Sequence, residues 1–323
     1  MLFFLFINLI YDNKIKWVIK VSQLKIGIPR SLFYYYDGYL WENFFQNLDC
    51  KIVISPKTTK EIMQKGSNLA SDEMCLSFKN YLGHVASLDG KCDYILVPRI
   101  DNYGVSNQTC TNFLAAFDIV NNLCKTNLIN YNINVDGRET EAKAFFKMGC
   151  IIEKDRAKVK WAYRLAKQKA NKRREKLVQD NLNRLSSFKK KILVIGHPYN
   201  LYDDYIGFPI LNILKKSNVE LIYSDLFPIE EAAKESSSLC HDLYWKYSKE
   251  LIGPIKMVEG KVDGILFLSA FPCGLDSLVN ELVIRKLNIP YLNLIMDDVD
   301  SLTGFETRLE SFIDILERSQ TNV

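Results

Sequence analysis

A short aliphatic run, Lys191-Ile192-Leu193-Val194-Ile195-Gly196, has the character of a buried first strand. A similar run, Lys25-Ile26-Gly27-Ile28-Pro29-Arg30, opens the first half of the chain. After each run, short apolar segments alternate with longer segments of helical pattern. This alternation is typical of parallel sheets with crossover helices. The two runs therefore predict two α/β units, each beginning with a buried parallel strand.

The alternation can be followed through both halves of the chain. In the first half we expect strands at residues 25–28, 51–55 and 94–98, and helices at 32–48, 58–69, 76–88 and 112–121. In the second half we expect strands at 191–196, 219–223, 264–269 and 291–296, and helices at 208–215, 242–259, 276–287 and 304–316. A faint repeat (KIGIPR with KILVIG, CDYILVPR with VDGILFLS) indicates duplication. The predicted fold class is α/β, with two Rossmann-like, doubly wound lobes joined by a long basic helical segment.

The length of 323 residues suits two domains of about 150 residues each. We expect an N-terminal lobe at 25–135, a helical connector at 136–190 and a C-terminal lobe at 191–323. The first ten residues (MLFFLFINLI) are apolar but fall short of the roughly 20 that a spanning helix needs, and they lack the flanks of a cleavable signal. We therefore expect residues 1–24 to be a non-native or accessory extension, with membrane anchoring as the weaker alternative, and a cytoplasmic protein with no membrane partner.

The positive charge is concentrated in one segment, residues 154–191, which carries 15 Lys or Arg against three acidic residues, a net charge of +12 in a chain of net charge +4. Such a stripe can bind phosphate backbones or acidic lipids. The segment also has helix-forming composition and neither Pro nor Gly. We favour a solvated connecting helix and expect no nucleic-acid partner; nucleic-acid binding would require salt-sensitive retention on DNA or RNA.

Three of the eight cysteines have distinctive surroundings: Cys75 in DEMC, Cys110 in TCTNF and Cys273 in FPCGLDS. Three thiolates brought together by folding could hold an iron–sulfur cluster with one iron left open. No C-x-x-C or zinc-type spacing is present, so spacing alone is a weak signal. The ordinary globular composition, 48% hydrophobic, does not favour disulfides. We expect the remaining cysteines to be inert and buried: Cys50, Cys92, Cys124, Cys150 and Cys240.

The predicted topology brings the distinctive cysteines toward one cleft. Cys110 and Cys273 each follow the third strand of their lobe, and ligands of open parallel sheets collect beyond the carboxyl ends of the strands. Cys75 stands at the start of a predicted helix, where the helix dipole favours the thiolate form. We therefore expect the three thiols to face a common site.

Several ordered motifs between residue 25 and about residue 316 resemble those of the 2-hydroxyacyl-CoA dehydratase component and double-cubane cluster protein group, particularly its acyl-CoA dehydratase activase-related members. The motifs are IGIPR at residues 26–30 with the tyrosines that follow, DEMC at 72–75 with Lys79 and Gly83-His84, VPR at 97–99, Cys110-x-x-Phe113, GHPYN at 196–200, F-x-CG-x-DS at 271–277, and G-x-x-TRLE-x-F at 304–312. The resemblance spans nearly the whole chain, which makes it more specific than any single motif.

The resemblance implies a cysteine-ligated [4Fe-4S] cluster held by Cys75, Cys110 and Cys273, with a double-cubane cluster as the alternative. It implies an oxygen-sensitive protein that receives low-potential electrons from an ATP-hydrolysing activator of the sugar-kinase/actin fold and passes them to an acyl-CoA thioester or a small molecule. Ferredoxin or flavodoxin would supply the electrons to the activator. The resemblance is also compatible with a homodimer or with a related second subunit. Ser77 and Thr111 depart from the prolines that are common near these cysteines, which indicates altered loops.

Five polar residues are further candidates for cofactor binding or for shaping the cleft: Arg30, His84, Arg99, His197 and Ser277. Arg30 and Arg99 follow strand-ending prolines, where a guanidinium can hold a phosphate or carboxylate or simply fix a loop. His84 could donate to a cluster sulfide or merely pack within its helix. For His197 we favour shaping of the site over ligation.

Two missing fingerprints constrain the mechanism. The chain has no G-x-x-x-x-G-K-[ST] phosphate loop, so we do not expect it to hydrolyse ATP itself, and no G-x-G-x-x-G, which disfavours a soluble dehydrogenase. Electrons would have to come from a separate ATPase. The sequence leaves open whether the chain is itself a dehydratase (lyase) or reductase component. The alternative function is a metal-free, two-lobed protein that binds a small ligand or assembles with partners, without catalysis.

Overall fold

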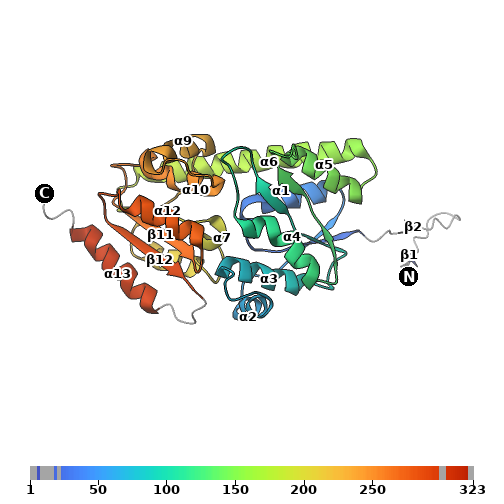
Figure 1. Ribbon diagram of the computed structural model, residues 1–323, viewed down its shortest axis with the longest axis horizontal. Coiled ribbons are helices and arrows are strands. Elements are labelled where there is room, and N and C mark those ends of the chain that lie inside the picture. Colours follow the sequence, from blue (N-terminus) through green and yellow to red (C-terminus); the bar gives the residue numbers. More distant parts are fainter. Residues whose placement is uncertain (1–5, 8–17, 20–22, 298–302, 319–323) are drawn as a thin grey trace.

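Two lobes, each built on a four-stranded parallel sheet, make up the computed structural model, which describes residues 6–7, 18–19, 23–297 and 303–318 (Figure 1). The first sheet has the order β4-β3-β5-β7 and the second β10-β9-β11-β12. In both, the first strand of the lobe lies between the second and the third. This identical order confirms the α/β, doubly wound fold, and the two lobes have the arrangement expected of a duplication.

The first lobe surrounds its sheet with five helices. Its strands are β3 (Lys25–Ile28), β4 (Lys51–Ile54), β5 (Tyr94–Leu96) and β7 (Asn127–Ile129). Its helices are α1 (Tyr34–Asn47), α2 (Lys60–Leu69), α3 (Leu76–Leu88), α4 (Thr111–Leu123) and α5 (Glu141–Ile152). A short parallel pair, β6 (Arg99–Asn102) and β8 (Asn132–Asn134), extends beyond β5 and β7. Aromatic residues fill the core, and Trp41, Phe44 and Phe78 are fully buried.

The second lobe has the same plan with a more aliphatic core. Its strands are β9 (Lys191–Ile195), β10 (Glu220–Tyr223), β11 (Gly264–Ala270) and β12 (Tyr291–Met296). Its helices are α7 (Pro198–Leu201), α8 (Phe208–Lys216), α9 (Ile229–Leu239), α10 (Lys246–Ile252), α11 (Pro254–Met257), α12 (Gly274–Ile284) and α13 (Thr303–Arg318). Every residue of β11 is buried, as expected for an interior parallel strand covered on both faces.

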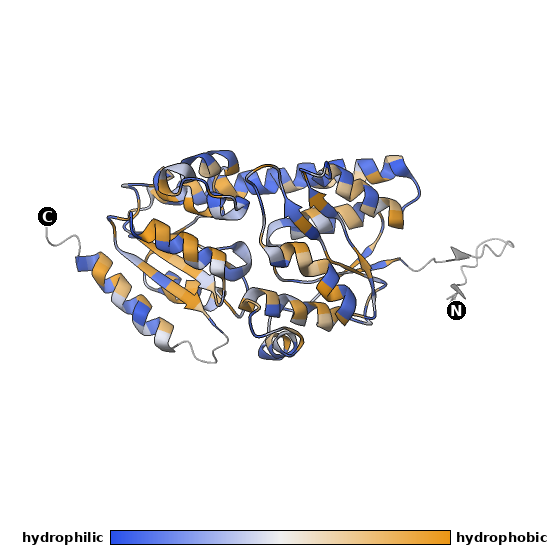
Figure 2. Cartoon of the chain, viewed as in Figure 1, coloured by the Kyte–Doolittle hydropathy of each residue, from blue (hydrophilic) through white to orange (hydrophobic). Residues whose placement is uncertain are grey.

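The basic segment forms one long helix, α6 (Arg156–Asn183), which runs along both lobes (Figure 1). Its surface is largely hydrophilic (Figure 2). Val159, Ala162 and Ala166 are buried against the first lobe. At its other end the Asn181 side chain bonds the backbone of Tyr223 and Leu226 in the second lobe, and a short 3-10 turn, η1 (Arg184–Ser186), leads into β9. The helix is therefore anchored at both ends.

The predicted single helix at 242–259 is wrong, because the structure divides this segment into α10 and α11. Gly253 stands at the break and packs so closely on α9 that a Cβ there would lie 1.8 Å from the Ala232 carbonyl oxygen. Pro254 then begins the next helix, a position where its missing N–H costs nothing. Helix α5 lies within the segment predicted as a helical connector, whereas strands β6, β7 and β8 and helices α7 and α9 were not predicted. The three strands are short, and two of the three residues of β8 are asparagine.

Near the start of the chain, β1 (Phe6–Ile7) pairs with β2 (Val18–Ile19) in an antiparallel manner. The prediction of a non-native or accessory extension at 1–24 falls mostly outside the described residues. Within the part of the chain that the structure describes, no helix is both long enough and apolar enough to cross a membrane.

Candidate functional site

Three helix N-termini meet at one pocket, and each begins with one of the distinctive cysteines. Cys75 is the N-cap residue of α3, Cys110 that of α4 and Cys273 that of α12. All three line the same pocket. N-cap positions usually hold Ser, Thr, Asp or Asn, whose oxygens accept from the free N–H groups of the first turn. Here sulfur atoms occupy those positions, in both lobes.

The pocket is small and mostly apolar. Its walls include Phe78, Phe113, Tyr199, Tyr247 and Leu275. The free space is about 40 Å³, enough for no more than a few water molecules. A group larger than water therefore enters only when the thiols and walls move apart.

N–H groups approach each thiol. The backbone N–H of Asp276 donates to Cys273 Sγ over 3.5 Å, and the Asn112 side-chain amide donates to Cys75 Sγ over 3.9 Å. Backbone N–H groups of Asn112 and Phe113 also lower the pKa of Cys110, against the larger effect of burial. These donors, with three positive helix ends, favour an anion at the centre of the pocket.

As free thiols, however, the three cysteines are protonated. Burial, with smaller contributions from the Cys110 thiol and the Asp276 carboxylate, raises the pKa of Cys75 to about 11, against the lowering effect of hydrogen bonds from the Phe78 backbone and the Asn112 side chain. Burial, the charge of Asp276 and the two other thiols raise the pKa of Cys273 above its usual range. The dipole of α3 does not by itself produce a thiolate at Cys75, because burial is the larger effect. A cation that binds the sulfurs is needed to remove their protons.

His197 lines the same pocket, with both ring nitrogens bonded. Its Nδ1 lies 2.7 Å from the Tyr36 hydroxyl and its Nε2 lies 3.1 Å from Asp276 Oδ1. Because an ionised carboxylate only accepts, Nε2 carries the proton and Nδ1 accepts from Tyr36. The ring also stacks on Tyr199, with centroids 4.8 Å apart. His197 is thus a fixed part of the wall, as a residue that shapes the site would be.

His84 lies elsewhere, in a buried polar network between the lobes. Its ring nitrogens bond the hydroxyls of Ser55 and Thr58 over 2.8 and 2.9 Å. Thr58 in turn donates to Asp203, which also accepts from Asn80 and from the Tyr35 hydroxyl. Asp203 belongs to the second lobe and the other members to the first. This network joins the lobes, and His84 does not line the cysteine pocket.

The remaining three candidates also lie outside the cysteine pocket. The Arg99 guanidinium pairs with Asp118 and lies over the Phe117 ring, so it holds α4 against β6. The backbone N–H of Arg30 bonds Ser55, while its Nε is buried without a partner. Ser277 is exposed on α12. For Arg99 the structure favours fixing of a loop over anion binding.

Backbone contacts between the lobes enclose the cysteine pocket. The Leu76 N–H donates to the Phe271 carbonyl. Leu76 directly follows Cys75, and Phe271 lies two residues before Cys273. Gln108 exchanges backbone hydrogen bonds with Tyr244 and Lys246 on the approach to α10. The sequence did not indicate that Gln108, Trp245 and Tyr247 line the pocket. None of them belongs to a motif that would have identified it.

The described residues include no group of three His, Cys, Asp or Glu side chains placed to hold a single metal ion. A cubane cluster has a different requirement, because each cysteine binds a different iron and the sulfurs need not converge on one point. The donor set fits that requirement: three thiols, apolar walls and N–H groups directed at sulfur. The other five cysteines are free and none lines this pocket.

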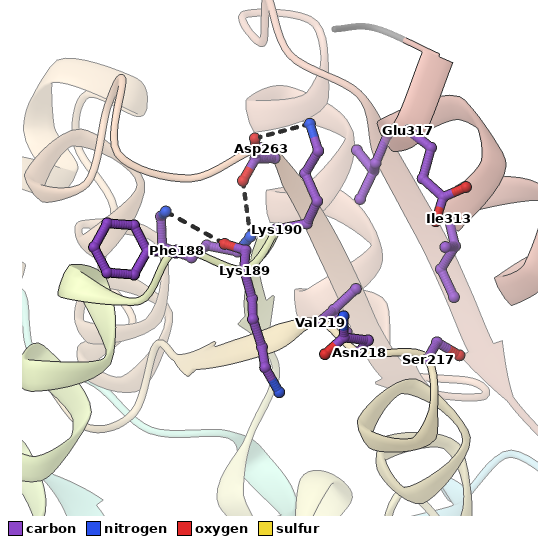
Figure 3. A pocket seen from close by; sticks show the side chains of 11 residues that line it. Phe188, Lys189, Lys190, Ser217, Asn218, Val219, Asp263, Ile313 and Glu317 are labelled. Carbon is purple, nitrogen blue, oxygen red and sulfur yellow. Dashed lines mark hydrogen bonds and ion pairs between the residues drawn. The ribbon is translucent and has the colours of Figure 1, made fainter.

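A larger pocket of about 310 Å³ lies at the opposite, amino edge of the second sheet (Figure 3). Lys189, Lys190 and Lys191 contribute to it, but Asp263 contacts Lys190 through its side chain and the Lys191 backbone N–H. Ligands of open parallel sheets bind at the carboxyl edge. We therefore assign the candidate site to the cysteine pocket.

A family model described as "CoA enzyme activase uncharacterised domain" matches residues 25–227, more than half of the chain. The chain belongs to this family. The matched part of the CoA enzyme activase domain contains Cys75, Cys110 and His197, whereas Cys273 lies beyond it. No curated protein matches the chain.

Two solved structures illustrate distant similarities to this CoA enzyme activase domain. The SBP FpvC from Pseudomonas aeruginosa in complex with Ni²⁺ is 15% identical, with a TM-score of 0.29 over 94% of this chain and 98% of that chain. A mutant of the laminin-binding adhesin Lmb from Streptococcus agalactiae is 11% identical, with a TM-score of 0.27 over 91% and 99%. These scores are too low to support an argument about function.

Proposed function

We propose that the protein is an iron–sulfur electron-transfer component that works with a CoA-enzyme activator, and that Cys75, Cys110 and Cys273 hold its [4Fe-4S] cluster. The observation that carries the proposal is the meeting of three cysteine-capped helix N-termini in one apolar pocket. Such a pocket provides thiols for iron and partial positive charge for an anionic cluster.

When bound, such a cluster supplies one-electron transfer at low potential and leaves one iron open to a further ligand. The protein's other pocket residues have two roles. Phe78, Phe113 and Tyr247 keep water from the pocket. Asp276 and Tyr36 hold the His197 ring in one orientation, with its Nε2 proton directed at Asp276.

The family and the missing fingerprints support a proposal for the electron source. Membership of the CoA enzyme activase family supports an ATP-hydrolysing activator of the sugar-kinase/actin fold as electron donor, with ferredoxin or flavodoxin upstream. We propose an acyl-CoA thioester or another small molecule as the acceptor. Three ligands suit one cubane, since a double cubane would need more thiols than this pocket offers.

Iron content tests the proposal. The protein is purified without oxygen, reconstituted with iron and sulfide, and examined for iron per chain and for its visible spectrum. We expect about four irons and broad absorption near 400 nm, both lost in the Cys75→Ala, Cys110→Ala, Cys273→Ala variant.

A matched control removes three other thiols, in the Cys92→Ala, Cys124→Ala, Cys150→Ala variant. These cysteines are partly buried outside the pocket, so this variant should keep its iron. Absence of iron in the wild type, under conditions that load a ferredoxin, would overturn the proposal and leave the metal-free two-lobed binding protein. Equal loss of iron from both variants would exclude this pocket as the site.

A further inference from the structure

A large cleft lies between the lobes, beside the cysteine pocket, and α6 forms one of its walls. Its volume is about 720 Å³, within the range of small-molecule sites. Helices α1 and α5 of the first lobe and β10, α8 and α10 of the second complete it. Ser224 of the lining directly follows β10, so the cleft reaches the carboxyl edge of the second sheet. This is the edge at which doubly wound folds bind their ligands.

Two ion pairs neutralise part of the lining. Six carboxylates and six cations line the cleft, so it has no net charge. Lys167 pairs with Glu141, and Lys246 pairs with Glu250. Both lysines lower the pKa of Asp37, but the charge of each lysine is balanced by its glutamate. The charge that a ligand meets is therefore set by the groups that remain unpaired.

Two carboxylates of the lining, Asp37 of α1 and Asp225 after β10, have no ion-pair partner among the described residues. Asp225 accepts a hydrogen bond from the Tyr202 hydroxyl over 2.8 Å. Burial is the main reason that the pKa of each of the two carboxyl groups is raised to about 6. A negative charge is thus costly at both positions, and a bound cation would stabilise both carboxylates.

Arg174 lies near both carboxylates and lowers the pKa of each. Its guanidinium donates to the backbone carbonyls of Asp225 and Phe227 rather than to a carboxylate. The interior of the cleft therefore holds two unpaired carboxylates against one guanidinium, an excess of one negative charge. The remaining cations of the lining are exposed and lie over aromatic rings: Arg173, Arg184 and Lys215. The interior thus favours a ligand with a single positive charge.

A buried hydroxyl gives independent support for a ligand. Ser224 directly precedes Asp225, is 1% exposed and lines the cleft, and its Oγ has no hydrogen-bond partner among the described residues. Buried polar atoms without a partner are rare, because their lost hydrogen bonds with water are not replaced. The Oγ atom can accept a hydrogen bond from an N–H group of a ligand, beside the Asp225 carboxylate.

Aromatic rings offer surfaces for the rest of such a ligand. Two rings of the lining already hold a cation, since Lys246 Nζ lies 4.8 Å from the ring centroids of both Tyr103 and Tyr247. Tyr36 and Tyr202 also line the cleft. The faces of such rings attract cations and pack against other rings.

We propose that this cleft binds a small organic ammonium ion that carries an aromatic ring. Ser224 and Asp225 accept hydrogen bonds from the ammonium group, and Asp37 adds negative charge at longer range. The tyrosines contact the ring of the ligand. No cysteine lines the cleft, so binding does not depend on iron.

Calorimetric titration of the full, iron-free chain tests the site with four probes: phenethylamine, phenylalanine, ethylamine and phenylacetate. We expect phenethylamine or phenylalanine to bind at least about tenfold more tightly than ethylamine, which lacks the ring, and phenylacetate, which lacks the ammonium group. The tighter of the two identifies a simple amine or an amino acid as the source of the ligand. The Cys75→Ala, Cys110→Ala, Cys273→Ala variant should bind equally well.

An isosteric substitution locates the site. Asp225→Asn should weaken binding of the tighter probe about tenfold, because it replaces a charged acceptor by a neutral one of the same shape. The asparagine keeps an oxygen that can accept from the Tyr202 hydroxyl. Asp136→Asn is the matched control: Asp136 is exposed and outside the cleft, so this variant should bind as the wild type does.

A second substitution separates a role in binding from a role in the fold. Ser224→Ala should weaken binding about threefold or more, because it removes a hydrogen bond to the ligand. It should leave the free energy of unfolding of the ligand-free chain unchanged or raised, since the hydroxyl that it removes has no partner there.

Three results would overturn the proposal. One is failure of both phenethylamine and phenylalanine to bind. Another is binding of ethylamine or phenylacetate as tightly as these two, which would mean that the cleft does not recognise an ammonium group attached to a ring. The third is an equal effect of Asp225→Asn and Asp136→Asn, which would indicate general attraction to negative charge.

Discussion

The two buried histidines show how the same side chain acquires different chemistry from its surroundings. The ring nitrogens of His197 bond the Tyr36 hydroxyl and the Asp276 carboxylate, and the ring lines the pocket of the three cysteines. His84 is fully buried and bonds only hydroxyls. Burial, with the nearby charge of Arg30, lowers the pKa of His84 to about 3, against a weaker opposing effect of Asp204. His84 is therefore neutral in the folded protein at any pH near neutrality.

This environment predicts a pH dependence of stability. The folded pKa of His84 lies below its unfolded value of about 6.5, so the unfolded chain takes up the proton first. The stability due to neutral His84 is fully present above pH 6.5 and is lost as the pH falls toward 3, by up to about 1.4 kcal/mol per pH unit. His84→Gln keeps hydrogen-bonding groups but cannot titrate. Its free energy of unfolding, measured in urea at pH 7, 6 and 5, should therefore fall less than that of the wild type.

The third histidine of the chain is the control for this experiment. His241 is exposed, so His241→Gln should leave the pH dependence of the wild type unchanged. If His84→Gln loses stability as steeply as the wild type, burial does not hold His84 neutral.

At the residue scale the sequence predicted the special cysteines better than the other polar groups. Cys75, Cys110 and Cys273 were chosen for their local surroundings, and the structure places all three at one pocket. Arg30, His84, Arg99 and Ser277 were chosen in the same way but lie elsewhere. An arginine after a strand can turn toward a site or toward the adjacent helix. The direction depends on where its ion-pair partner lies. For Arg99 the partner is Asp118, which lies on a different element.

At the scale of elements, close helix packing explains two glycines whose role was not apparent from the sequence. Helices α2 and α3 cross at Gly66 and Gly83. A Cβ on Gly66 would lie 1.8 Å from the Lys79 carbonyl oxygen, and one on Gly83 would lie 2.0 Å from the Ile62 carbonyl oxygen. The pair also packs on the second lobe, since Met63 and Leu76 belong to its core. Residue Gly83 thus maintains the position of the helix that begins at Cys75.

We expect Gly83→Ala to destabilise the protein. Overpacking costs about 1–3 kcal/mol and more where backbone must move, which exceeds the gain of about 1 kcal/mol for replacing glycine by alanine in a helix. The net loss should be about 2 kcal/mol in urea unfolding.

Gly304→Ala is the matched control, because no atom lies within 4 Å of the added Cβ. Because Gly304 lies in α13, the stability of this variant should be unchanged or should rise by up to about 1 kcal/mol. Equal effects of the two substitutions would contradict the role of close helix packing.

The boundaries of elements were predictable where the pattern was unambiguous. Helix α3 and strands β3 and β12 have the predicted bounds, because periodicity and flanking turns agree there. Strand β7 has three residues, and its place in the sheet depends on pairing with β5. A strand of that length carries too few residues to show a period, and only the finished sheet identifies it.

At the scale of the whole molecule, Asp203 is the main polar link between the lobes. It is fully buried in the second lobe and accepts hydrogen bonds from Thr58, Asn80 and Tyr35 of the first. No motif in the sequence distinguished it from Asp204, its neighbour. Which carboxylate is buried depends on how the lobes meet, and local pattern does not encode that.

The two adjacent carboxylates give a direct test. Asp203→Ala leaves several buried donors without a partner and should cost about 3 kcal/mol or more. Asp204 pairs with the exposed Lys57, so Asp204→Ala should cost about 1 kcal/mol or less. Urea unfolding followed by tryptophan fluorescence measures both. Similar losses would show that the buried network does not join the lobes as described.

The origin of the three thiols in different lobes has a consequence for biosynthesis. Cys75 and Cys110 leave the ribosome with the first lobe, whereas Cys273 is synthesised only after α6 and most of the second lobe. Domains generally fold as units, in the order of their synthesis. The nascent first lobe therefore carries two of the three thiols, and the pocket is complete only after α6 and β9 to β11 of the second lobe have been synthesised.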